Sequence, residues 1–254
     1  YNWDDGTFGG SIYIQSVGSA ERRFLVKGYD PDWSPDGQWL TFSSIGYNIE
    51  KVSLDGKKVV QLTSQSKDLV PAWSPDGKTI AYYVATSDEN TSGIAVLDVN
   101  GVSSGRLFLG GTPDWFPDGR LFAYLGRASS FLIYDRKSAH LDTIPAPLPG
   151  PQVVHSPQVS PDGKRIVFYS ESGGIWLCNI DGSDMRLIVR DDLSKYASGN
   201  PEVRVGVPSW HPDGRHIIFE YLKITKFMTN DIGHAIDGEY SIRTMDVGPV
   251  AKKG

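Results

Sequence analysis

The sequence predicts an all-β protein, a β-propeller made of four-stranded blades. Three observations predict it: a repeat of 40 to 51 residues, a Pro-Asp-Gly turn in each copy, and alternating apolar residues after each turn. The chain has 254 residues, of which 39% are hydrophobic and 22% are charged. This composition is typical of a globular protein with a buried core, and the length fits one all-β domain over residues 1–254.

The repeat aligns at several positions besides the turn. The prolines of the five Pro-Asp-Gly turns are spaced by 40, 42, 44 and 51 residues: Pro35, Pro75, Pro117, Pro161 and Pro212. A second proline stands four residues earlier in each copy. The residues two positions before the turn proline are Trp33, Trp73, Trp115, Val159 and Trp210. Apolar residues follow five and seven positions after it, so five equivalent segments run from about residue 28 to residue 254.

Each segment can be built from known turn and strand chemistry. Proline presets φ for a tight turn, aspartate accepts hydrogen bonds from turn amides, and glycine supplies a φ above zero. The alternating apolar pair then lies on one face of the following strand. Further along come second hairpin turns, at Asp55-Gly56, Asn100-Gly101 and Asp181-Gly182, and less typically at Asp135-Arg136 and Val247-Gly248. Each segment therefore contains four strands, as a propeller blade does.

Residues 33–37 and 73–77 both read Trp-Ser-Pro-Asp-Gly. This motif resembles the TolB-type propeller repeat, also called the WD40-like or PD40 repeat. Phe116 and His211 depart from the pattern where serine is usual, and Val159 departs where tryptophan is usual. The resemblance implies six blades, a periplasmic or otherwise exported bacterial protein, and a role as an assembly or interaction module.

The two ends of the chain do not complete a sixth blade. Residues 10–27 are expected to form an outer hairpin without a full inner pair, and the fifth segment ends about where its last strand should begin. We therefore expect six blades with one incomplete, which a longer chain or a partner would complete. The alternative is five blades with an N-terminal clasp that hides sheet edges.

Charge and cysteine content exclude several functions. Lys and Arg number 25 against 30 Asp and Glu, for a net charge of −5 without a long basic run, so nucleic-acid binding is not expected. The single cysteine, Cys178, excludes an intrachain disulfide and a multi-cysteine zinc site. No apolar run approaches the roughly 18 residues of a membrane span, and no cofactor is expected.

Long connections are predicted on one face of the propeller. Short turns share the opposite face, whereas residues 85–93, 144–157, 191–207 and 223–239 form what we call the long-loop face. Loops on a rigid scaffold often carry binding residues, although such length variation can also be neutral. The predicted binding residues are Phe227, Met228, Asp231, His234, Asp237, Glu239, Asp191, Asp192, Tyr196, Arg204 and His155. The alternative for Phe227 and Met228 is a small apolar cluster beneath the loop.

The candidate metal-binding and nucleophile motifs predict a function less strongly than the long loops do. His155 and His234 are expected on the long-loop face with Asp231 and Asp237, a donor set that zinc or manganese accepts. Some polysaccharide lyases resemble this propeller and hold a metal with loop histidines, but no such histidine trio aligns here. His140 and His216 are expected on strands or turns, and His211 fills a serine position of the repeat. We therefore predict no metal site.

The segment from Gly101 to Gly105 matches Gly-x-Ser-x-Gly, the nucleophile motif of serine hydrolases. That motif needs a strand before it and a helix after it, whereas here it falls in a hairpin turn. The five motif aspartates repeat, while catalysis needs one unique constellation. Trp3, Trp39 and Trp176 lie outside the repeat; packing is the default for them, although an exposed one could bind sugar or a partner.

Together these patterns predict a noncatalytic propeller that binds a protein or peptide through the long-loop face and the channel mouth. The alternative is a carbohydrate-active enzyme, either a metal-dependent polysaccharide lyase or a glycoside hydrolase, with its site at the same mouth. The fold by itself does not show which of these two functions the protein has.

Overall fold

The computed structural model describes most of the chain. The described residues are 2–3, 10–16, 19, 21–64, 67–87, 91–125, 130–145, 154–170, 173–190, 202–227 and 235–248. By its internal contacts the chain forms two compact units, one of residues 1–125 with 132–142 and one of residues 126–131 with 143–254. Within the described ranges, no helix has the length and apolar character needed to cross a bilayer.

The described secondary structure is almost entirely strand. In chain order the strands are β1 (Asn2–Trp3), β2 (Ser11–Gln15), β3 (Arg22–Lys27), β4 (Tyr29–Trp33), β5 (Trp39–Ser43), β6 (Ile49–Ser53), β7 (Val59–Gln61), β8 (Asp68–Trp73), β9 (Thr79–Val84), β10 (Gly93–Asp98), β11 (Ser103–Leu109), β12 (Gly111–Trp115), β13 (Leu121–Leu125), β14 (Ser130–Asp135), β15 (His140–Pro145), β16 (Val154–Val159), β17 (Arg165–Ser170), β18 (Gly174–Asn179), β19 (Arg186–Arg190), β20 (Glu202–Val205), β21 (Ser209–Trp210), β22 (His216–Phe227) and β23 (Ala235–Asp246).

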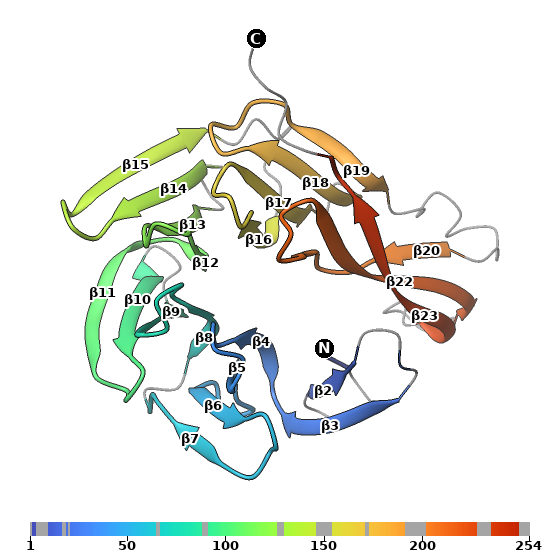
Figure 1. The fold of residues 1–254 in the computed structure, drawn as a ribbon, viewed down its shortest axis with the longest axis horizontal. Helices are drawn as coiled ribbons and strands as arrows, with labels where there is room; N and C mark the ends of the chain where they lie inside the picture. The colour runs from blue at the N-terminus through green and yellow to red at the C-terminus, as the bar shows by residue number, and fades with distance from the viewer. Residues whose placement is uncertain are drawn as a thin grey trace. The chain divides into compact units, whose positions relative to one another are not determined.

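These strands form a propeller of five four-stranded blades, which confirms the predicted fold and agrees with its five-bladed alternative. Blades one to four are meanders: β4–β7, β8–β11, β12–β15 and β16–β19 (Figure 1). In the fifth, β20 and β21 both pair with β22, and β23 pairs with the other edge of β22. The expected hairpin of residues 10–27 is present as β2 and β3, and β1 pairs with β2 to make a three-stranded sheet.

The Pro-Asp-Gly turn of the first blade shows why the motif repeats. The hydroxyl of Ser34 donates to Asp36 Oδ1 (2.6 Å) and accepts from the amide of Trp39 (2.9 Å). Asp36 Oδ1 also accepts from the amide of Gln38 (3.0 Å), and Gly37 has φ +67°. The aspartate and serine thus satisfy the polar groups of the turn, which is the structural role expected of the motif aspartates.

Replacing Gly37 by alanine is expected to lower the free energy of unfolding by about 1 kcal/mol, because alanine disfavours a φ of +67°. A Cβ at this position would meet no atom within 4 Å, so the loss comes from the backbone conformation alone. Urea denaturation measures it. Gly111→Ala is the matched control, because its Cβ would make ordinary contacts without a positive φ, at 3.8 Å from the carbonyl oxygen of Tyr124. An equal loss in both variants would contradict this account of the turn.

The motif tryptophans pack between blades, with one exception. Trp115 Nε1 donates to the carbonyl oxygen of Ala72 in the preceding blade (2.9 Å), and Trp210 Nε1 donates to that of Gln158 (3.1 Å). Trp73 is also buried. Trp33, which holds the same position of the repeat, is 46% exposed. The sheet before Trp33 in the chain has three strands, β1–β3, whereas the sheets before Trp73, Trp115 and Trp210 have four.

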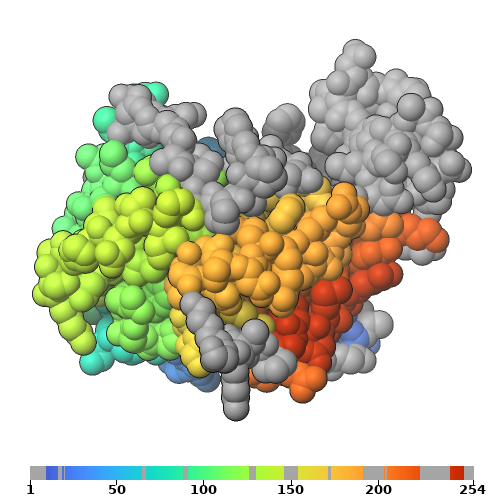
Figure 2. All heavy atoms as spheres, turned by 90° about the horizontal axis from the view of Figure 1, so that it is seen from above, coloured from blue at the N-terminus to red at the C-terminus, as the bar shows by residue number. Residues whose placement is uncertain are grey.

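In the second compact unit, the fourth and fifth blades share an apolar core. Val167, Ile175, Trp210 and Ile217 are among its buried members. In the space-filling view, the orange residues of the fourth blade adjoin the red residues of the fifth (Figure 2). Trp210 and Ile217 of this core flank the turn of residues 211–216.

Candidate functional site

The structure describes only part of the predicted long-loop face. The predicted binding residues that lie outside the described part are Asp191, Asp192, Tyr196, Met228, Asp231 and His234. Four others fall on strands, Arg204 in β20, Phe227 in β22, and Asp237 and Glu239 in β23, and their side chains also lie outside the described part. The predicted binding role of these ten residues stays a prediction.

The connection at residues 223–239 is mostly regular structure, so its prediction as an irregular insertion is wrong. Strand β22 continues to Phe227 and β23 begins at Ala235, with Lys223 opposite Glu239 in the antiparallel register. The alternation of Leu222, Lys223 and Ile224 is a strand pattern that could have shown this extension from the sequence. In the same way, β20 occupies part of the expected loop at residues 191–207.

His155 lies in β16 and is half-buried. It is opposite Tyr169 of β17 in the register, and the two ring centroids are 6.0 Å apart. Its expected companion His234 lies outside the described residues, so the predicted pairing of these two histidines stays untested.

The nucleophile motif and the cysteine take ordinary structural places. The segment from Gly101 to Gly105 joins β10 and β11, and Ser103 begins β11, which confirms the predicted hairpin context. Cys178 is buried in β18, and burial raises the pKa of its thiol to about 12. A thiol with such a pKa is a poor nucleophile at neutral pH.

The first compact unit contains a wide cavity of about 810 Å³ beside Trp39, which we call the Trp39 groove. Its lining residues are Arg23, Gln38, Trp39, Ser53, Leu54, Asp55, Lys57 and Lys58. They come from β3, from the Pro-Asp-Gly turn of the first blade with the start of β5, and from the end of β6 with the β6–β7 turn. Those two turns lie on the short-turn face, opposite the face on which we expected binding.

Positive charge surrounds the indole of Trp39. The ammonium groups of Lys51 and Lys58 stand 5.0 and 5.5 Å from its ring centroid, within the range of cation–π attraction. Lys51 is held in place because it donates to the carbonyl oxygen of Val99 (2.6 Å). Desolvation, and then the charge of Lys58, lower the pKa of Lys51. The two lysines are thus close enough to repel each other, and an anion would relieve that repulsion.

The groove is cationic on an acidic chain. Its lining has three basic side chains, Arg23, Lys57 and Lys58, and one acidic side chain, Asp55. Asp55 is 3.8 Å from Lys57 across an exposed pair, and Arg23 donates to the carbonyl oxygen of Leu54 (2.5 Å). The whole chain has a net charge of −5, so this concentration of cations is local.

A second hollow of about 610 Å³ in the same unit lacks this bias. Its lining residues are Ser74, Pro75, Asp76, Trp115, Pro117, Asp118, Gly119, Arg120, Asp135, Arg136 and Lys137. Three carboxylates face three basic groups there, and Arg120 Nη2 already pairs with Asp118 at 2.9 Å. The second hollow therefore offers a ligand less net charge than the Trp39 groove does.

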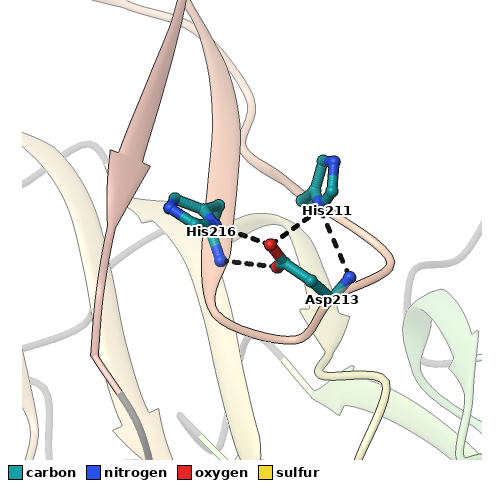
Figure 3. Close-up of side chains that lie close together, drawn as sticks. All are labelled: His211, Asp213 and His216. Atoms are coloured by element: carbon teal, nitrogen blue, oxygen red, sulfur yellow. Dashed lines mark hydrogen bonds and ion pairs between the residues drawn. The ribbon is translucent and has the colours of Figure 1, made fainter.

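The second compact unit brings two histidines together around one aspartate. His211 and His216 flank Asp213 in the Pro-Asp-Gly turn of the fifth blade, and we call these three residues the His-Asp-His turn (Figure 3). Asp213 Oδ2 is 3.1 Å from His211 Nδ1 and 2.6 Å from His216 Nδ1. The amide hydrogen bond from Arg215 and the side-chain hydrogen bond from His216 hold the pKa of Asp213 well below its usual range.

Sequence reasoning placed these residues correctly but missed their convergence. His211 does fill a serine position, and His216 does begin a strand. The signal for this convergence was the spacing His-Pro-Asp-Gly-Arg-His. In the first blade, the residue before the turn proline, Ser34, contacts the residue four positions after that proline, Trp39. In the fifth blade, histidine occupies both of these positions.

Comparisons with known proteins identify the kind of propeller. No protein-family model matches the chain. An uncharacterised protein of Agrobacterium fabrum is 30% identical over 135 residues, which cover 45% of this chain and 46% of that protein. The Tol-Pal system protein TolB of Alcanivorax borkumensis is 30% identical over 82 residues, which cover 30% of this chain and 19% of TolB. The matches thus span less than half the length of either relative.

Solved structures resemble the whole fold more completely. A putative TolB from Agrobacterium tumefaciens superposes with a TM-score of 0.68 at 22% identity, covering 93% of this chain and 84% of that one. TolB from Acinetobacter baumannii superposes with a TM-score of 0.66 at 15% identity, covering 86% and 58%. An oligogalacturonate lyase in complex with manganese gives a TM-score of 0.53 at 17% identity, covering 84% and 66%. At these identities the likeness concerns the fold, and the chain is an all-β, TolB-like propeller.

Proposed function

We propose that this protein is a noncatalytic binding propeller whose Trp39 groove takes an acidic, extended segment of a protein partner. The observation that carries the proposal is that the indole of Trp39, which has two ammonium groups within 5.5 Å of its ring centroid, lines a groove with excess positive charge. A TolB-like fold supports a protein-binding scaffold in general.

The groove combines the two features that protein recognition needs. Tryptophan and arginine are enriched among residues that dominate binding energy, and Trp39 and Arg23 both line the cavity. Positive charge gives selectivity and fast association with an acidic partner. Arg23 is already positioned by the backbone carbonyl oxygen of Leu54, so little of its side-chain entropy would be lost on binding.

The long-loop face and the channel mouth, which the sequence predicts as the binding surface, remain part of this proposal as a further contact surface. We also propose a periplasmic or extracellular location, because the resemblance is to TolB proteins. The carbohydrate-active alternative has weaker support, because the likeness to the lyase is a likeness of fold at 17% identity.

The binding experiment uses two fluorescent peptides of equal length, one rich in glutamate with a central aromatic residue and one rich in lysine. Fluorescence anisotropy is expected to show binding of the acidic peptide only, weakening as salt rises. The double variant Lys57→Glu/Lys58→Glu is expected to weaken binding at least tenfold, because it reverses two charges beside Trp39.

The matched control is Arg120→Glu/Lys137→Glu, which makes the same charge change in the second hollow. It should leave the affinity for the acidic peptide within about twofold, since these sites do not line the Trp39 groove. Equal weakening by both double variants would show a general charge effect and overturn the assignment to the groove, as would unchanged binding in the Lys57/Lys58 variant.

A further inference from the structure

We propose that the His-Asp-His turn of the fifth blade binds one divalent first-row transition-metal ion, for which Zn²⁺ is the appropriate probe. Each of the three residues offers one ligand atom, and these atoms lie within 4.8 Å of one another. The proposal is independent of the Trp39 groove, which is built from other residues in the first compact unit.

The present spacing is close to that of a coordinated ion. Ligand atoms about 2.0–2.2 Å from zinc in a tetrahedral site stand roughly 3.3 Å apart. Asp213 Oδ2 is 3.1 Å from His211 Nδ1 and 2.6 Å from His216 Nδ1. The ion would be admitted if side-chain rotations widened these two separations by less than about 1 Å and brought the third, which is at most 4.8 Å, toward the same value.

The two carboxylate oxygens of Asp213 have separate roles. Oδ1 accepts the backbone amides of Arg215 (2.8 Å) and His216 (3.0 Å), which fixes the orientation of the side chain. Oδ2 faces the two imidazoles. The same hydrogen bonds keep the carboxylate ionised, as a metal ligand must be.

His211 Nδ1 lies close to two polar groups of Asp213. It is 3.1 Å from the carboxylate Oδ2 and 3.3 Å from the backbone nitrogen. Either a proton or a metal ion can join Nδ1 to Oδ2, because a metal ion displaces protons from the atoms that bind it.

The turn itself does not require histidine. In the first, second and fourth blades a serine hydroxyl donates to the motif aspartate, at 2.6 to 2.7 Å. The position that His216 fills holds Trp39, Thr79, Leu121 and Arg165 in the other four blades. Two histidines around one aspartate are thus peculiar to the fifth blade, whereas the turn is common to all five.

Neighbouring basic groups are engaged away from the three ligand atoms. Arg215 pairs with Asp246 Oδ2, at 2.5 Å from Nη2. Arg165 donates to the carbonyl oxygens of Gly214 (2.6 Å) and Gly248 (2.7 Å), and so ties the turn to the following segment. These contacts hold the turn in shape before an ion arrives, which lowers the entropy lost on binding.

The donor set selects the class of metal. Two imidazole nitrogens and one carboxylate oxygen suit zinc and other first-row transition ions, whereas calcium and magnesium prefer oxygen ligands throughout. His211 and Asp213 are exposed, so water can complete the coordination.

Isothermal titration of the chelator-treated protein with ZnCl₂ tests the site. We expect a site of one ion per chain, little heat with MgCl₂, and a rise in melting temperature with Zn²⁺. His211→Ser restores the repeat serine, and His216→Thr restores the residue of the second blade, so both variants should fold. Each is expected to lower zinc affinity at least tenfold, and Asp213→Asn should do the same while retaining Oδ1 for the turn amides.

His140→Ala is the matched control, because His140 also pairs with an aspartate, Asp142, at 3.0 Å but with no third ligand in the described residues. It should bind zinc as the unaltered protein does. Stoichiometric binding that His211→Ser and His216→Thr leave intact would overturn the proposal, as would the absence of binding. Loss of zinc on replacing His155 or His234 instead would assign the ion to the long-loop face.

Discussion

Replacing Trp115 by alanine is expected to lower the free energy of unfolding by about 3–5 kcal/mol, the largest effect of any change considered for this protein. Trp115 is 6% exposed and packs among Ala72, Ile94 and Leu121. Its indole nitrogen also donates to the carbonyl oxygen of Ala72, so the variant loses apolar contacts and a buried hydrogen bond together. Chemical denaturation followed by circular dichroism measures the loss.

Trp33→Ala is the matched control, because Trp33 occupies the same position of the repeat and is 46% exposed. We expect it to cost less than about 1.5 kcal/mol, since much of its apolar surface is already in water. A loss as large as that of Trp115→Ala would show that Trp33 is packed in solution, and would contradict the open position described above.

The contribution of Asp32 to the free energy of unfolding is expected to fall as pH rises from about 4 to about 7. Desolvation raises the pKa of Asp32 to about 6, against 3.8 for an ordinary aspartate. The folded state therefore binds more protons than the unfolded state in this range, and stability is highest below the unfolded pKa. A shift of about two units corresponds to at most roughly 3 kcal/mol, lost as the pH passes through the folded pKa.

Asp32→Asn should remove this loss, so that the variant is more stable than the unaltered protein at pH 7 and no more stable at pH 4. Asp32 Oδ2 accepts the backbone amide of Trp73 in the next blade (2.6 Å), and an asparagine oxygen can do the same. In the fourth blade an amide side chain already accepts the equivalent hydrogen bond: Gln158 Oε1 accepts from the backbone amide of Trp210 (3.3 Å).

Urea denaturation at several pH values compares Asp32→Asn with the unaltered protein and with Asp36→Asn. The serine hydroxyl and the turn amide lower the pKa of Asp36, so its contribution has the opposite sign: it is present at pH 7 and is lost as pH falls. Asp36→Asn should therefore be the less stable of the two at pH 7. Parallel pH profiles for the unaltered protein and Asp32→Asn would refute the role of Asp32.

The candidate sites were less predictable than the fold. Trp39 could be selected from the sequence as a tryptophan outside the repeat, but the lysines around it come from β6 and the β6–β7 turn, so their approach depends on strand register. The convergence of His211 and His216 required knowing which positions meet across the turn. Loop length favoured residues 223–239 as the binding segment, but much of this segment pairs as a regular hairpin.

The sequence by itself determined the repeat, the turns and the alternation of apolar residues, and hence five four-stranded sheets. These features are local, because turn φ angles and a side-chain period of two depend on residues a few positions apart. Only the tertiary structure decided that Trp33 is exposed while Trp115 is buried, and that cations gather over Trp39. Burial and electrostatic potential depend on which sheets become neighbours, and residues that are far apart in the chain decide that.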